Sequence, residues 1–188
     1  MLYVCQLDYP DVPYPQHPYH PDDFIDSSGC GVCCACMIVG NLLGVPFSVA
    51  ECAEFAIRSG ARDRYGTDMV VLADALSRRF PLEWTGTDDA EAALAFLHAR
   101  KGMAVANPQG DREGHTGLFT RSGHYIVIAE ACRRTVRILD PSLQPGKFDR
   151  EGRRGQVFVS GTDVYCDMDA VTDDGIRSPM FYLFSRRA

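Results

Sequence analysis

The segment Ser27-Ser28-Gly29-Cys30-Gly31 decides the fold, because it places a cysteine between two glycines at the start of an apolar stretch. Residues 30–43 have the spacing of a helix, which Ser27 or Ser28 would cap at its N-terminus and Gly44 would end. Free N–H groups at a helix N-terminus favour a thiolate, and the glycines leave room for a substrate backbone. Cys30 is therefore either a nucleophile or a buried structural thiol, and this segment alone does not decide between the two.

Three residues elsewhere in the chain have the side chains that a thiol nucleophile requires. Gln6 lies upstream, His124 follows a glycine at the start of a predicted strand, and Asp140 ends the next strand. A thiol needs a base, an acid that orients the base, and donors to the oxyanion of the tetrahedral intermediate. Cys30, His124, Asp140 and Gln6 are the candidate site for this chemistry.

The remaining pattern predicts an α+β protein in which helices come first and strands follow. Prolines exclude helices from an arm over residues 1–26, and Ser48 to Glu51 form a capping box. We predict one domain over residues 1–188, with a helical part at 27–102 and a β-rich part at 103–188. The predicted helices are 30–43, 48–58, 67–80 and 87–100; the strands are 103–106, 124–131, 135–139, 156–159 and 180–184, with a glycine-rich loop at 107–123 and a polar or helical stretch at 162–171.

The strand pair that carries His124 and Asp140 can be tested for geometry. Opposed residues of an antiparallel pair share a face, and a loop at residues 131–133 would place His124 opposite Asp140. A turn at Arg133-Arg134 would place them on opposite faces, because a one-residue slip inverts every side chain. We favour the first register.

Composition limits the classes of partner and the compartment. Hydrophobic residues make up 46% of the chain and charged residues 23%, as in an ordinary globular protein. A net charge of −6 argues against nucleic acid or an anionic membrane as the main partner. The sequence shows no signal peptide and no membrane span, which predicts a cytoplasmic protein, and its eight cysteines are expected to be reduced.

Four segments together resemble the papain-fold, leader-peptidase-like proteins of cysteine peptidase family thirty-nine, in particular the stand-alone bacterial members. They are spread over residues 6–141 and occur in the expected order, which makes the set far more specific than any one motif. The segments are Gln6-Leu7-Asp8-Tyr9-Pro10-Asp11-Val12-Pro13-Tyr14, Asp26-Ser27-Ser28-Gly29-Cys30-Gly31, Gly117-Leu118-Phe119-Thr120-Arg121-Ser122-Gly123-His124-Tyr125 and Leu139-Asp140-Pro141.

The resemblance implies a papain-like fold and a role for each candidate residue. Cys30 would be the nucleophile, His124 the base, Asp140 the orienting residue and Gln6 a side-chain donor to the oxyanion hole. The chain departs from the family at Val32-Cys33-Cys34, where the family commonly has Pro-Thr-Ser. This departure bears on substrate preference more than on the chemistry.

Other residues have similar chemistry and remain alternatives. His115 rivals His124 as base, but a loop histidine lacks the facing carboxylate that fixes a tautomer. Gln16 and Gln109 could replace Gln6, and only the family spacing selects Gln6. Cys30, Cys33 and Cys34 have part of a zinc-ligand spacing, but the second ligand pair of a structural site is missing, so we expect neither metal nor cofactor.

Three functions fit this candidate site. The first is a cysteine peptidase or amidase that hydrolyses a peptide or acyl-amide substrate through a thioester on Cys30. The second is an acyltransferase or transpeptidase that uses the same thioester. The third is a catalytically silent module that binds a peptide.

Overall fold

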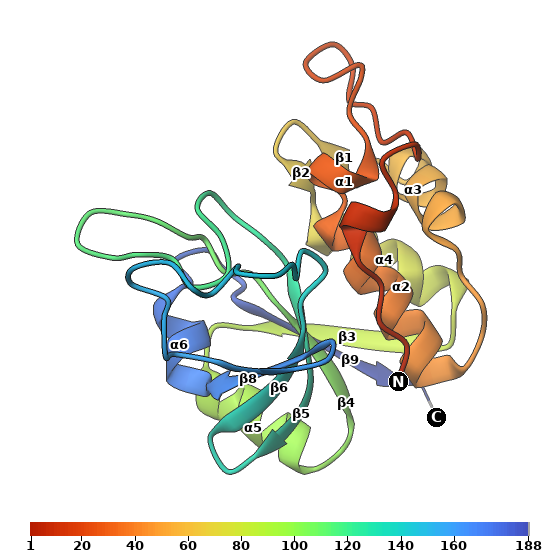
Figure 1. The fold of residues 1–188 in the computed structure, drawn as a ribbon. Helices are drawn as coiled ribbons and strands as arrows, with labels where there is room; N and C mark the ends of the chain where they lie inside the picture. The colour runs from red at the N-terminus through yellow and green to blue at the C-terminus, as the bar shows by residue number, and fades with distance from the viewer. Residues whose placement is uncertain (188) are drawn as a thin grey trace.

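A seven-stranded antiparallel sheet forms the centre of the computed structural model, which describes residues 1–187. Its strand order is β3-β9-β4-β5-β6-β8-β7. Helices α1 to α4 cover one face of the sheet, and α5 and α6 lie on the other (Figure 1). The helices are α1 (Ile25–Ser28), α2 (Cys30–Leu43), α3 (Val49–Arg58), α4 (Met69–Arg79), α5 (Ala90–His98) and α6 (Met168–Asp173); the strands are β3 (Leu82–Thr87), β4 (Gly102–Ala106), β5 (Ile126–Cys132), β6 (Thr135–Leu139), β7 (Phe158–Ser160), β8 (Asp163–Asp167) and β9 (Phe181–Arg186).

Apolar side chains are buried on both faces of the sheet. In β4, Met103 and Val105 pack toward α2, whereas Ala104 and Ala106 pack toward α5, and β9 alternates in the same way. This period of two explains why the central strands read as continuous apolar runs in the sequence. Helix α2 packs its buried side chains against β4, β5 and β9, and its N-terminus lies beside Tyr125, directly before the start of β5.

The helix predictions agree closely with the structure. Helix α2 spans residues 30–43 and ends at Gly44 in the left-handed conformation (φ 69°). The Ser48–Glu51 capping box of α3 is present, and Asp68 caps α4. The predicted cap of α2 was wrong: Gly29 occupies that position, and the Ser27 and Ser28 hydroxyls bind Phe24 and Asp23 instead.

Two strand predictions were incomplete. Strand β3 lies inside the region predicted to be helical, because its partner β9 is about a hundred residues away in the chain and no local pattern shows the pairing. The stretch predicted as polar or helical at 162–171 divides into β8 and α6. The arm holds one 3-10 turn, Gln6–Asp8, before its first proline. The organisation of residues 1–188 as one domain stays a prediction.

The predicted register of the β5–β6 hairpin was wrong. The turn is Arg133-Arg134, with Cys132 opposite Thr135 and Arg133 in the left-handed conformation (φ 53°). A bulge at Ala129 then shifts the register by one residue, so that Ile128 faces Ile138. Because the bulge restores the parity that the turn removed, His124 and Asp140 still meet beyond the strand ends.

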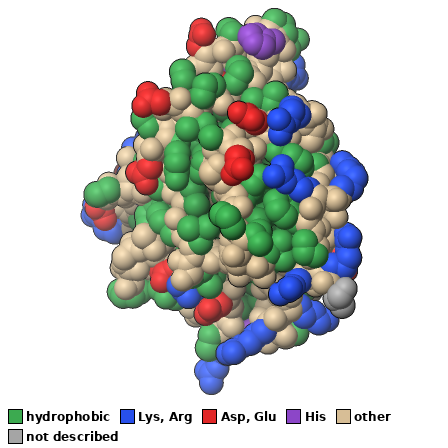
Figure 2. Space-filling model, turned by 90° about the vertical axis from the view of Figure 1, so that its right-hand side faces the viewer, with side chains coloured by type: hydrophobic (Ala, Val, Ile, Leu, Met, Phe, Trp, Pro, Cys, Tyr) green, Lys and Arg blue, Asp and Glu red, His purple; other side chains and the backbone are tan. Residues whose placement is uncertain are grey.

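The surface carries charges of both signs. On the helical side of the molecule, apolar side chains gather over the centre of the face, and basic side chains lie mostly along its right-hand and lower edges (Figure 2). Within residues 1–187, no helix combines the length and apolar character that crossing a membrane requires.

Candidate active site

Cys30 occupies the first turn of α2, where backbone geometry favours an ionised thiol. Gly31 next to it faces Thr67 so closely that an added Cβ would lie 2.6 Å from the threonine Cβ. Glycine is therefore required for the hairpin β1 (Arg62–Asp63) and β2 (Gly66–Thr67) to approach the nucleophile.

His124 lies against Cys30 with its ring held from the opposite side. Its backbone N–H donates to the Pro108 carbonyl at 2.9 Å, and its Nε2 lies 2.8 Å from Asp140 Oδ1. The residue is only 8% exposed. Because Nε2 is engaged by Asp140, Nδ1 is the ring nitrogen left for the thiol proton.

The pKa values of this pair shift toward an ion pair. Burial raises the pKa of the Cys30 thiol, but the hydrogen bond and charge of His124 and the N–H groups of Tyr125 and Gly31 outweigh burial and lower it. Burial lowers the pKa of His124, whereas Asp140 and Cys30 raise it above its usual value. Both shifts favour a thiolate beside an imidazolium over a neutral thiol beside a neutral imidazole.

Asp140 is fully buried directly after β6 and is held by four groups. Its Oδ1 accepts from His124 and from the Ser142 backbone N–H at 2.9 Å, with the Ser142 hydroxyl at 3.2 Å. Its Oδ2 accepts from the Lys147 ammonium. Burial raises the pKa of this carboxyl, but Lys147 and His124 hold it well below its usual range, so Asp140 is ionised.

Gln6 connects the two halves of the site. Its backbone N–H donates to the Pro141 carbonyl at 2.7 Å, beside Asp140, and its Nε2 donates to the Asp26 carbonyl at 2.7 Å, shortly before Cys30. An amide Nε2 carries two hydrogens, and Asp26 uses one of them. The second has no hydrogen-bond partner among the described residues.

A cleft of about 430 Å³ opens beside Cys30 and His124. The glycine-rich loop lines it, whereas the proline-rich arm contributes none of its lining residues. The wall opposite His124 comes from the β1–β2 hairpin, which the sequence did not reveal as part of the site. The other lining residues are Asp63, Tyr65, Gly66, Thr67, Asp68, Val70, Asn107, Ser122, Gly123, Tyr125, Arg177, Ser178 and Tyr182.

Arg62 fixes this hairpin to the arm, and no motif singled it out. Its buried guanidinium donates to the carbonyls of Tyr14 (2.8 Å) and Gly66 (2.9 Å) and pairs with Asp23 at 2.6 Å. The Tyr14 hydroxyl in turn lies 2.9 Å from the Thr67 hydroxyl. These contacts join the proline-rich arm to the β1–β2 hairpin, which forms part of the wall of the cleft.

Replacing Arg62 by methionine is expected to lower the free energy of unfolding by roughly 2–4 kcal/mol, because it leaves buried carbonyls and Asp23 without their donor. Urea denaturation measures the change. Arg64→Met in the same hairpin is the matched control, since Arg64 is exposed, and it should change stability by less than about 0.5 kcal/mol. Equal losses in both variants would contradict the anchoring role of Arg62.

The alternative residues lie elsewhere in the molecule. His115 pairs with the buried carboxylate of Asp174 at 2.8 Å and lines a different cavity from Cys30. Cys33 and Cys34 lie on the buried side of α2, where burial raises the pKa of both thiols. Across the described part of the chain, no group of three or more His, Cys, Asp or Glu residues is placed to hold a metal ion.

Among known proteins, only solved structures were found to be similar to this chain. No protein-family model matches the chain, and neither does any curated protein. Solved structures do. The peptidase domain of Streptococcus ComA, a bifunctional ABC transporter involved in quorum sensing, is 13% identical, with a TM-score of 0.59 over 92% of this chain and 96% of that domain.

The chain has the papain-like fold of family thirty-nine peptidase domains. A protein described as a C39-like peptidase from Bacillus anthracis aligns over 100% of this chain and 99% of its own, with 13% identity and a TM-score of 0.58. A double glycine motif protease from an AMS/PCAT transporter, solved with its leader peptide, is 14% identical, covers 84% of each chain and has a TM-score of 0.50. The likeness to family thirty-nine structures confirms the predicted α+β fold. At these identities it does not establish an activity.

Proposed function

We propose that this protein is a cysteine peptidase that hydrolyses a peptide bond through a thioester on Cys30. The observation that carries the proposal is the chain of contacts from the thiol through His124 to an ionised, buried Asp140 at the edge of an open cleft. A structural neighbour bound to a leader peptide supports a peptide as substrate. Bacterial origin and a cytoplasmic location belong to the same proposal.

In the first half of the reaction, the Cys30 thiolate attacks the carbonyl carbon of the substrate and forms a C–S bond. The carbonyl electrons move to oxygen, where the Cys30 backbone N–H and the free N–H of Gln6 stabilise the oxyanion. His124 gives its Nδ1 proton to the leaving nitrogen as the C–N bond breaks. A thioester and a free amine result.

In the second half, His124 accepts a proton from water, whose oxygen attacks the thioester. Collapse of the second oxyanion breaks the C–S bond and releases the carboxylic acid and the thiolate. Asp140 keeps Nε2 protonated throughout, so that Nδ1 carries out both proton transfers.

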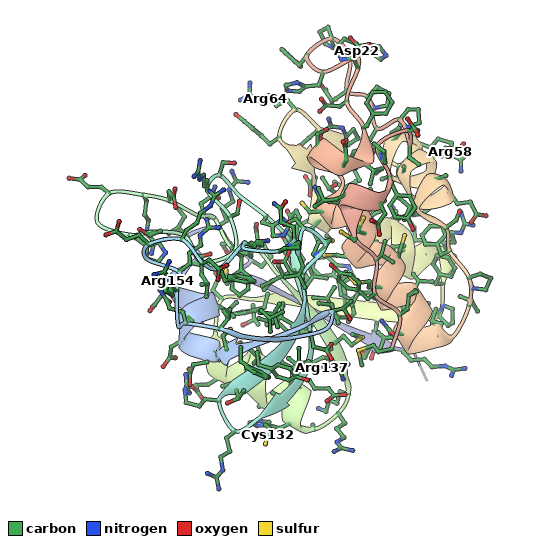
Figure 3. All side chains as sticks on the ribbon, viewed as in Figure 1. Asp22, Arg58, Arg64, Cys132, Arg137 and Arg154 are labelled. Atoms are coloured by element: carbon green, nitrogen blue, oxygen red, sulfur yellow. The ribbon has the colours of Figure 1, made fainter. Side chains whose placement is uncertain are left out.

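Iodoacetamide at pH 6 is expected to alkylate Cys30 at least about tenfold faster than Cys132, because the lowered pKa of Cys30 increases the fraction of its thiol that is ionised. Cys132 is an internal control, since it is exposed at the outer end of the β5–β6 hairpin (Figure 3). Peptide mapping by mass spectrometry gives both rates. Equal rates, or faster labelling of Cys33 or Cys34, would contradict the assignment.

The same alkylated protein tests turnover on a peptide library. Untreated protein should cleave a subset of peptides, and alkylated protein should cleave none. An added amine separates the two thioester chemistries, because hydrolysis gives free acids and acyl transfer gives amides. A reactive Cys30 without any cleavage would favour a peptide-binding module.

A further inference from the structure

Lys147 is an unexpected member of the site, because a lysine in a glycine-containing loop is ordinarily exposed. Its side chain is only 7% exposed. Its ammonium donates to Asp140 Oδ2 and also to the Ser142 hydroxyl oxygen at 2.6 Å. The same hydroxyl lies 3.0 Å from His124 Nε2. Lys147 thus contacts Asp140 and Ser142, the two side chains that lie at His124 Nε2.

The number of donors and acceptors on these side chains limits which hydrogen bonds they can form. An ammonium only donates, so the Ser142 oxygen accepts from Lys147 and its own hydrogen must go to Asp140 or to His124. Donation to His124 Nε2 would place the ring proton on Nδ1, and that tautomer cannot take the thiol proton. Donation to Asp140, whose charge Lys147 maintains, leaves the Nε2 hydrogen on the carboxylate and Nδ1 free.

We propose that Lys147 is a positioning residue, which together with Ser142 holds Asp140 ionised and His124 in the tautomer that accepts the Cys30 proton. The inference rests on the proposed thiol chemistry and extends the Cys-His-Asp set by two residues. Lys147 touches no substrate and acts only through Asp140 and Ser142. It sits between the site and a mostly apolar cavity of about 440 Å³ on its far side.

Other charged or titratable groups surround the pair. They come from the N-terminal segment, from α2, from the start of β5 and from the loop after β6, and the only cation among them besides Lys147 is protonated His124. These groups are Tyr3, Cys5, Cys30, Cys34, His124 and Asp149. Since the neighbouring groups otherwise carry negative charge or none, removal of the ammonium leaves Asp140 without its main compensating charge.

The test is the pH dependence of Cys30 alkylation, which needs no peptide turnover. In Lys147→Met, Asp140 should protonate more readily, and the His124 imidazolium that stabilises the thiolate should then lose its carboxylate partner. Both effects raise the acidic midpoint of the rate profile, by about one pH unit. Lys147→Arg keeps the charge and should lie closer to the wild type.

Lys101→Met is the matched control, because it removes the other lysine of the chain, an exposed one, and changes net charge equally. Its midpoint should equal that of the wild type. Ser142→Ala breaks the link to His124 with a smaller change and should shift the midpoint in the same direction as Lys147→Met, even if the lysine variant does not fold. An unchanged midpoint in either folded variant overturns the proposal. A slowly reacting Cys30 in the wild type would instead overturn the proposed function.

Discussion

His124→Ala is expected to lower turnover by about a thousandfold, because the thiol loses both its base and the charge that lowers its pKa. Without the imidazole, only the backbone N–H groups of Tyr125 and Gly31 still oppose the effect of burial, so the pKa of the Cys30 thiol rises. Alkylation at pH 6 should therefore slow together with peptide cleavage. The measurement is turnover of one library peptide by variants first shown to be folded by circular dichroism.

The matched control for this variant is His115→Gln, which keeps a donor for the buried Asp174. It should retain most of the activity, since His115 lies outside the cleft. If His115→Gln were inactive and His124→Ala active, the base would be His115, and the contact between His124 and Asp140 would be structural only.

Gln6→Ala is expected to reduce kcat by about a hundredfold to a thousandfold while Cys30 still alkylates at the normal rate. Alkylation by iodoacetamide is a direct displacement at a methylene carbon and forms no oxyanion, whereas peptide cleavage forms two. The difference between the two assays isolates the oxyanion donor from any general damage to the site.

Gln16→Ala is the control for Gln6, because Gln16 has the same side chain but its backbone pairs with His20 within the arm, whereas the backbone of Gln6 binds Pro141 beside Asp140. It should leave kcat unchanged. Loss of alkylation in Gln6→Ala would show that Gln6 supports the position of Cys30 through Asp26, and full turnover in that variant would remove it from the oxyanion hole.

Sequence patterns within a few residues predicted the helices well. The strands were predicted less well, because their pairing depends on residues far apart in the chain. The cap at Asp68 and the glycine at residue 44 act within one turn, so the sequence alone defines α4 and the end of α2. Strand β3 depends on β9, which local patterns cannot indicate. The juxtaposition of His124 and Asp140 was predicted from a register that the structure does not have. The two residues meet nevertheless, because the bulge in β5 compensates for the two-residue turn.

The candidate site divides in the same way. Cys30, His124, Asp140 and Gln6 stand in recognisable motifs, and the structure brings their segments together, although their roles stay a proposal. Lys147, Ser142 and Arg62 have no motif, because their importance comes from burial in the folded chain and not from neighbours in sequence.

The position of β9 has a consequence for the order of assembly during synthesis. This strand pairs with β3 on one side and with β4 on the other, so both remain open edges until residues 181–186 have left the ribosome. Tyr182, which lines the cleft, arrives with the same strand. A nascent chain therefore carries Cys30 without a finished cleft around it until β9 has emerged, and the cleft closes only with that strand.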